Sequence, residues 1–167
     1  SDMPGETMAS GPRYARATEI MKIVRTLLNG ESLDFQGEFY QLKLDPPRIG
    51  TISGKCPAFY FGGLSHDARE CAAEASDVYL MWPETREMLA QRMRDVHARA
   101  AYYGRVLDYG LRVHMIVRDT EAEAREYARE LVSKLDDEKG REIRARALDA
   151  GSLGVSTQAR SREMADI

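Results

Sequence analysis

Tyr109-Gly-Leu-Arg-Val-His-Met-Ile-Val117 is the stretch of this sequence that decides the fold. It is dense in valine, isoleucine and leucine and precedes a helix that we expect to begin near Asp119, so it predicts a buried strand of a β/α unit. Side chains alternate between the two faces of a strand, so Arg112 and His114 share one face and the opposite face is apolar. Because a buried cation is costly unless a polar or anionic group meets it, this pair predicts the lining of an active site.

Two more short apolar strands are predicted upstream, near residues 58–61 and 78–82. Helical patterns separate the three strands, from Ser65 to about Ala75 and from Thr85 to about Tyr103. Connections of this length return the chain in the same direction, so we expect the strands to be parallel and adjacent, with the helices on their outer side. Residues 58–149 are therefore predicted to form a series of β/α units.

The flanking segments have patterns of their own. Apolar residues at helical spacing predict a helix over 13–30, and alternation on both sides of Gln36-Gly-Glu38 predicts a hairpin over 33–42 that stays outside the parallel sheet. Thr120-Glu-Ala-Glu123 is a capping box that opens a further helix. The residues at 150–167 are small and polar, which predicts a mobile tail. The apolar residues expected to point inward from the last helix are Ala124, Tyr127, Ala128, Leu131 and Leu135.

The composition is typical of a soluble globular domain: 167 residues, 43% hydrophobic and 31% charged, with a formal net charge of -3. The mild acidity argues against nucleic-acid binding, and no apolar run is long enough to span a membrane. The first residues lack the pattern of a signal peptide. Cys56 and Cys71 lack the spacing of a zinc site, so we expect no bound metal and two reduced thiols in a cytoplasmic protein.

A second candidate for function is Phe59-Tyr-Phe-Gly-Gly-Leu-Ser-His-Asp67, which places a Gly-Gly turn and a serine between a strand and a helix. Backbone N–H groups at a helix N-terminus bind phosphate, and glycines let the ligand come close. The same residues also fit a simple chain turn with Ser65 as a helix cap, which is common in β/α folds. For Arg112 and His114, the alternative interpretation is a structural ion pair or satisfied polar groups in the core. For Trp82, it is packing at a strand end.

Five motifs stand in one order along the chain, from about residue 13 to about residue 155. They are Arg13-Tyr14-Ala-Arg, Phe35-Gln-Gly-Glu-Phe39, Phe59-Tyr-Phe-Gly-Gly-Leu-Ser65, Val78-Tyr-Leu-Met-Trp82 and Gly110-Leu-Arg-Val-His-Met-Ile-Val-Arg118. Together they resemble the bacterial luciferase-like flavin monooxygenases, and within that family they most resemble the alkanesulfonate monooxygenases. Each motif is weak alone, and their shared order makes the resemblance specific.

The resemblance implies a (β/α)8 TIM barrel that uses reduced FMN and O2, with the reduced flavin supplied by a separate NAD(P)H-dependent flavin reductase. It implies cleavage of the carbon–sulfur bond of a small alkanesulfonate or related compound to an aldehyde and sulfite, and a homo-oligomeric enzyme. Arg112 and His114 match strand residues that face the substrate and would be catalytic. The residues expected to bind the cofactor are Tyr14, Gly62, Gly63, Leu64, Ser65 and Trp82.

Two features depart from the family pattern. Ala9-Ser-Gly-Pro12 stands where family members have acidic residues and a histidine. The length is also short, because a complete barrel takes about 250 residues and only three barrel strands are predicted here. We therefore expect an internal portion of the barrel, whose open edges favour self-association or pairing with the missing strands. The alternatives are a truncated or degenerate non-catalytic protein that binds flavin or serves in assembly, and a deazaflavin-dependent oxidoreductase of the same fold.

Overall fold

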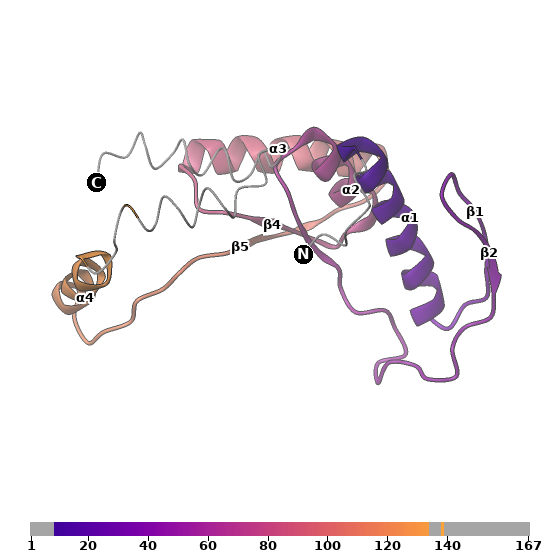
Figure 1. Ribbon diagram of the computed structural model, residues 1–167, viewed down its shortest axis with the longest axis horizontal. Coiled ribbons are helices and arrows are strands. Elements are labelled where there is room, and N and C mark those ends of the chain that lie inside the picture. The colour runs from indigo at the N-terminus through magenta and orange to yellow at the C-terminus, as the bar shows by residue number, and fades with distance from the viewer. Residues whose placement is uncertain (1–8, 134–137, 139–167) are drawn as a thin grey trace. The chain divides into compact units, whose positions relative to one another are not determined.

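The computed structural model describes residues 9–133 and residue 138. Contacts within the chain divide it into two units, Ser1–Arg112 and Val113–Ile167, and each is described by itself. Figure 1 shows the elements in chain order: α1 (Ser10–Leu28), β1 (Leu33–Gln36), β2 (Gln41–Leu44), β3 (Tyr60–Gly62), α2 (His66–Ala75), β4 (Val78–Met81), α3 (Arg86–Tyr102), β5 (Asp108–Leu111) and α4 (Glu121–Ser133).

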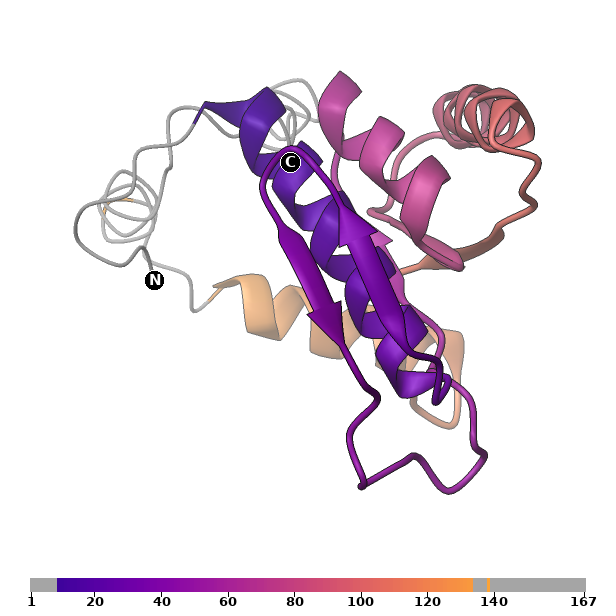
Figure 2. The same cartoon turned by 90° about the vertical axis from the view of Figure 1, so that its right-hand side faces the viewer.

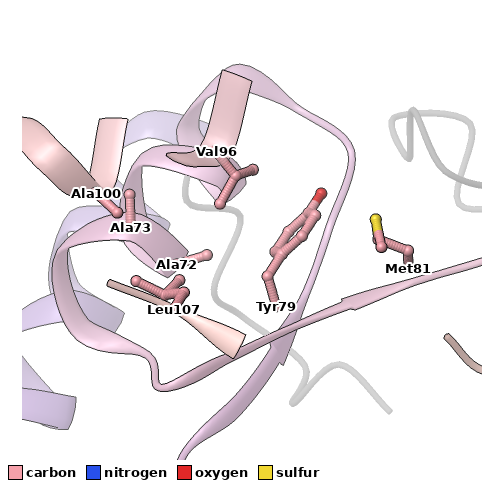
Figure 3. Close-up of a cluster of buried hydrophobic side chains, with 7 residues drawn as sticks. All are labelled: Ala72, Ala73, Tyr79, Met81, Val96, Ala100 and Leu107. Carbon is pink, nitrogen blue, oxygen red and sulfur yellow. The ribbon is translucent and has the colours of Figure 1, made fainter. Parts of the chain in front are cut away.

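The three predicted barrel strands form one parallel sheet in the order β3-β4-β5, which confirms the sequence-based arrangement. β4 is central, and its Val78 pairs with Tyr60 on one side and Asp108 on the other. The helices α2 and α3 pack against one face of this sheet. Their contact with the strands is a cluster of buried side chains, shown in Figure 3: Ala72, Ala73, Tyr79, Met81, Val96, Ala100 and Leu107.

Short side chains and local caps explain these two helices. The buried face of α2 consists largely of alanines, which let the helix lie close to the sheet. Ser65 caps α2 as predicted, because its Oγ accepts a hydrogen bond from the Ala68 N–H at 3.2 Å. Thr85 caps α3 in the same way, accepting from the Met88 N–H at 3.3 Å.

The predicted hairpin also forms, and it lies outside the parallel sheet. β1 and β2 pair antiparallel from Leu33 opposite Leu44 to Gln36 opposite Gln41. Figure 2 shows this hairpin lying along α1. The Glu19 carboxylate of α1 attaches it there, because it accepts hydrogen bonds from the backbone N–H groups of Glu38 (2.6 Å), Phe39 (3.1 Å) and Tyr40 (3.0 Å).

The amino end of the parallel sheet is closed by a network around Asp77, the residue before β4. Its carboxylate accepts hydrogen bonds from Arg25 Nη2 of α1 at 2.8 Å, from the Phe59 N–H at 2.7 Å and from Arg105 Nη2 at 3.4 Å. Burial raises the pKa of Asp77, but the hydrogen bonds from Arg25 and Phe59 outweigh burial and hold that pKa below its ordinary value. The carboxylate therefore stays charged and joins α1 and the strand ends.

One strand prediction is wrong in length. β5 ends at Leu111, whereas a strand over 109–117 was expected. The Arg112 N–H still donates to the Met81 carbonyl at 2.9 Å, but the next donor due after β4 is Pro83, which has no N–H to continue the ladder. Residues 113–117 are exposed and belong to no strand. The period of two therefore places Arg112 on a face of the sheet but does not extend to His114.

In the second unit, the predicted capping box forms at the start of α4. The Thr120 N–H donates to Glu123 Oε2 at 2.9 Å, and the Glu123 N–H donates to Thr120 Oγ1 at 3.3 Å. The inward apolar face expected for this helix stays a prediction. Within the described part of the second unit, none of the residues of α4 is buried. Leu135 and the predicted tail at 150–167 lie outside the described residues.

No helix among the described residues is both long and apolar enough to cross a membrane. The described residues also contain no group of histidine, cysteine and carboxylate side chains that could hold a metal ion.

Candidate active site

The candidate site lies where β3, β4 and β5 end. Parallel strands present their carboxyl ends at one edge of a sheet, and the loops at that edge carry function in β/α folds. Gly63, Trp82 and Arg112 are the residues that follow these three strands. Met81 is paired with Leu111, so Trp82 and Arg112 come next to each other in the register.

Arg112 and Trp82 are in contact. The Arg112 guanidinium carbon lies 4.8 Å from the centroid of the Trp82 ring, which is a cation–π arrangement. Alternation along the strands puts both residues on the face opposite Tyr79, whose side chain packs against α2 and α3. Both side chains are exposed, and no carboxylate of the described residues forms an ion pair with Arg112. A guanidinium with this exposure is available to an anionic ligand.

The Gly62–Ser65 turn and Tyr14 also come together. A side chain at Gly63 would meet the Cβ of Ala68 at 2.5 Å, and the same point lies 3.7 Å from the Tyr14 hydroxyl. The Tyr14 ring packs edge to face on Phe61, with centroids 6.1 Å apart. Tyr14 of α1 therefore lies next to the turn.

The roles within the turn differ from residue to residue. Close packing against Ala68 explains the glycine at position 63 without any ligand. Leu64 is buried, so only its backbone is open to a ligand. Ser65 uses a lone pair to accept from Ala68, and its O–H remains a donor. The first turn of a helix also leaves backbone N–H groups without an intrahelical acceptor. The turn can therefore offer several donors to an anion.

One charge at the start of α2 opposes anion binding. Asp67 lies in the first turn, where its carboxylate interacts favourably with the positive end of the helix. Its Oδ1 is 3.6 Å from His66 Nδ1. An anion at this turn must therefore be bound beside a carboxylate, with the helix terminus and its N–H groups as the attractive partners.

His114 belongs to the second unit of the chain. It lies in the exposed segment that follows β5. The first unit brings together Arg112, Trp82, Tyr14 and the Gly62–Ser65 turn at one edge of the sheet. The predicted pairing of Arg112 with His114 on one strand face stays without support, because the strand ends before His114.

Three residues behind this edge were not found from the sequence: Tyr79, Glu84 and Arg92. Tyr79 is fully buried, and its hydroxyl donates to the Gly63 carbonyl at 2.6 Å. Glu84 Oε2 accepts from Arg92 Nε at 3.0 Å, and Glu84 Oε1 accepts from Arg92 Nη2 at 2.8 Å. In the sequence Arg92 is one of several charges along a helix, which is typical of a solvated face. No local signal marks it as buried.

A cavity of about 280 Å³ borders Arg92 between α2 and α3. Its lining consists of Arg69, Met88, Gln91, Arg92 and Asp95. Arg69 Nη1 is 2.5 Å from Asp95 Oδ2, so the charges of the wall are paired. None of the predicted site residues lines this cavity.

Comparison with known proteins gives the family. Residues 5–166 match the luciferase-like monooxygenase family. The chain belongs to that family. It is 73% identical over 166 residues to the sulfoquinovose monooxygenase of Novosphingobium aromaticivorans, and 57% identical over 169 residues to that of Agrobacterium fabrum. Each match covers 99% of this chain but only 46% and 44% of the relatives, so the chain spans less than half of their length.

Solved structures confirm the predicted luciferase-like fold. The riboflavin lyase crystallised with modified FMN and riboflavin matches with a TM-score of 0.66 at 17% identity, and DmoA from Hyphomicrobium sulfonivorans with a TM-score of 0.64 at 17% identity. These matches cover 77% and 78% of this chain and 34% and 33% of those proteins. The chain is therefore a part of that fold, as its three parallel strands indicate.

Proposed function

We propose that this chain is part of a flavin-dependent, two-component monooxygenase that cleaves the carbon–sulfur bond of an organosulfonate. The two relatives, both sulfoquinovose monooxygenases, favour sulfoquinovose, a sulfonated sugar, over the simple alkanesulfonate that the sequence motifs suggested. The products expected are an aldehyde and sulfite, with one oxygen atom of O2 entering the aldehyde and the other leaving as water. The observation that carries the proposal is the exposed Arg112 stacked on Trp82.

Arg112 is the group proposed to bind the sulfonate. A guanidinium keeps its charge at any physiological pH and donates two parallel hydrogen bonds to the oxygens of an anion such as a sulfonate. Stacking on Trp82 leaves the edge of the guanidinium, where its N–H groups point, free for that contact. A tryptophan ring is also a suitable apolar surface for a sugar ring. In the Trp82–Arg112 pair, Arg112 therefore offers a partner to the sulfonate of a sulfosugar and Trp82 offers one to its sugar ring.

The residues at the turn fit the phosphate of FMN. Gly62, Gly63, Leu64 and Ser65 would hold that phosphate through backbone N–H groups and the Ser65 hydroxyl, at the positive end of α2. Tyr14 would lie beside the flavin, since its hydroxyl is held over the turn. Trp82 would contact the flavin or the substrate from the neighbouring strand end. When bound, the reduced flavin supplies the two electrons with which O2 is activated.

His114 is proposed as the proton donor or acceptor for the reaction, because histidine is the side chain that most often does this work. Its position after β5 puts it on the same segment as Arg112 in the sequence. We also propose an NAD(P)H-dependent flavin reductase as the partner that supplies reduced FMN, a homo-oligomeric assembly and a cytoplasmic location.

The test uses the full-length protein with reduced FMN, a flavin reductase and O2, and measures sulfite release. Sulfoquinovose and octanesulfonate are compared at equal concentrations. Sulfite from sulfoquinovose, with one aldehyde formed per sulfite, is the expected result. Sulfite from octanesulfonate alone would correct the substrate. Flavin binding without sulfite from either compound would favour the non-catalytic alternative. Activity only with reduced deazaflavin would favour a deazaflavin-dependent oxidoreductase of the same fold.

A further inference from the structure

Arg92 and Glu84 form the least exposed ion pair among the described residues. Their side chains are 15% and 8% exposed. Two hydrogen bonds join the guanidinium fork of Arg92 in α3 to both carboxylate oxygens of Glu84, at 3.0 and 2.8 Å. This two-point contact fixes the orientation of each group as well as their distance. The pair therefore attaches the loop between β4 and α3 firmly to the helix.

That loop is the one that carries Trp82. Only Pro83 separates Trp82 from Glu84, and a proline has a fixed φ angle, so little freedom remains between the two residues. Where Glu84 is held, the Trp82 backbone is held as well. Because the Arg112 guanidinium lies on the Trp82 ring, the position of the charge proposed to bind the sulfonate depends on the same anchor.

The other half of the site is supported by the buried Tyr79. Burial raises the pKa of the Tyr79 phenol, and the positive charge of Arg92 opposes that effect. That hydroxyl donates to the Gly63 carbonyl at 2.6 Å. Glu84 thus fixes the Trp82 loop through Arg92, and Tyr79 supports the Gly62–Ser65 turn through its own hydrogen bond.

We propose that Arg92 is a positioning residue which, through Glu84, holds the Trp82 loop in the arrangement that places the Trp82 ring against Arg112. What the site binds rests on the proposed function, whereas the positioning itself is measured without turnover. The cavity beside Arg92 sharpens the expectation, since close packing there cannot replace the lost hydrogen bonds. Without the pair, the loop gains freedom although the core stays in place.

Trp82 supplies the readout because it is the single tryptophan of this chain, and in the full-length protein any tryptophan outside this chain is replaced by phenylalanine. The variant Arg92→Lys keeps the charge and loses the two-point contact. We expect its tryptophan emission to shift to longer wavelength and acrylamide to quench it more strongly. In a chain with the native Arg92, Arg112→Ala uncovers the Trp82 ring and should raise acrylamide quenching. The same substitution should raise quenching less in the Arg92→Lys variant, where Trp82 is already displaced from Arg112. The control Glu121→Gln, in an exposed pair with Arg125 on α4, should change neither signal.

The outcomes separate positioning from a purely structural role. A lower melting temperature with unchanged Trp82 emission and unchanged response to Arg112→Ala would overturn the proposal. If Arg92→Lys fails to fold, the Trp82 fluorescence of the double variant Glu84→Leu/Arg92→Met is measured instead. An apolar pair stays buried but has no hydrogen bonds to fix the orientation of the loop. A native Trp82 signal in that double variant would equally overturn the proposal, and a shifted signal would support it. None of these readouts needs sulfite formation, so failure of the proposed substrate leaves the test intact.

Discussion

The two ends of the parallel sheet are built in opposite ways. At the amino end, the Asp77 carboxylate is shared by Arg25, Arg105 and the Phe59 N–H, so the charges there are paired. At the carboxyl end, Arg112 is exposed, has no ion pair among the described residues and lies on Trp82. In β/α barrels the amino face serves stability and the carboxyl face carries function. The comparison teaches which arginines are candidates for a ligand and which are structural.

The largest effect on stability is expected from Asp77→Ala. It removes the shared acceptor and leaves the guanidinium groups of Arg25 and Arg105 with backbone carbonyl partners but no carboxylate, so we expect the free energy of unfolding to fall by about 2–3 kcal/mol. Urea denaturation measures this change. Asp34→Ala is the matched control, because its pair with Lys43 is exposed and should contribute less than about 1 kcal/mol. An Asp77→Ala chain as stable as the parent would remove the structural role assigned to the amino end.

Arg112→Ala should reduce activity and leave stability almost unchanged, the reverse of Asp77→Ala. Loss of a charge-assisted contact worth roughly 1.5–3 kcal/mol lowers kcat/KM for the sulfonate by about 10- to 100-fold, while stability changes by less than about 0.5 kcal/mol. Sulfite release and urea denaturation of the full-length protein check the two halves of this statement. Arg125→Ala, on the exposed surface of α4, is the control for loss of one positive charge. Equal turnover in both variants would make Arg112 a structural residue after all.

Acid should weaken the first unit through its paired carboxylates. Burial raises the pKa values of Asp77 and Asp95, but hydrogen bonds with arginines outweigh it and leave both below their ordinary value of 3.8. A group with a lowered pKa in the folded state contributes stability above its unfolded pKa and loses it as the pH falls through the folded pKa. The melting temperature should therefore be flat from pH 7 to about 5 and fall below about 4.

The variant Asp77→Asn should reduce that acid dependence, because the asparagine has no proton to gain. Melting curves of the parent and the variant, recorded at the same ionic strength, check this point. A fall of equal size in both chains would mean that carboxylates other than Asp77 dominate acid unfolding. The exposed residues Asp34 and Glu121 again serve as controls.

The sequence predicted those features that depend on neighbours along the chain. Ser65 and the Thr120–Glu123 capping box have local signatures, and both form. The parallel order of the three strands follows from the length of their crossovers. The end of β5 could not be predicted in this way, because it is set by Pro83, which follows the adjacent strand β4.

The candidate site was predictable only in part, for the same reason. The motifs placed Trp82 at a strand end and Arg112 on the neighbouring strand, and the register makes them neighbours. The contact of Arg92 with Glu84 depends on how α3 packs on the sheet. The burial of these two side chains could therefore not be predicted from the sequence. His114 lies beyond the ladder, where alternation no longer decides the direction of a side chain.

The smallest expected effect is the most selective one, and it compares Ser65 with Thr85. Both cap helices that follow strands of the same sheet, with hydroxyl acceptors 3.2 and 3.3 Å from a backbone nitrogen. Replacing either by alanine should cost about 1 kcal/mol of stability. Only Ser65 lies at the turn proposed to bind phosphate, so Ser65→Ala should also weaken FMN binding by about fivefold, the loss of one hydrogen bond.

Titration of the folded full-length variants with oxidised FMN, followed by flavin fluorescence, measures that difference at constant stability. Thr85→Ala should bind FMN as the parent does, because its helix begins beside the β4 loop and supplies no group to the turn. If the two variants bind FMN equally well, Ser65 is a helix cap alone. The glycines of the turn would then be explained by the close approach of Gly63 to Ala68, and the phosphate would have to be bound elsewhere on the carboxyl edge.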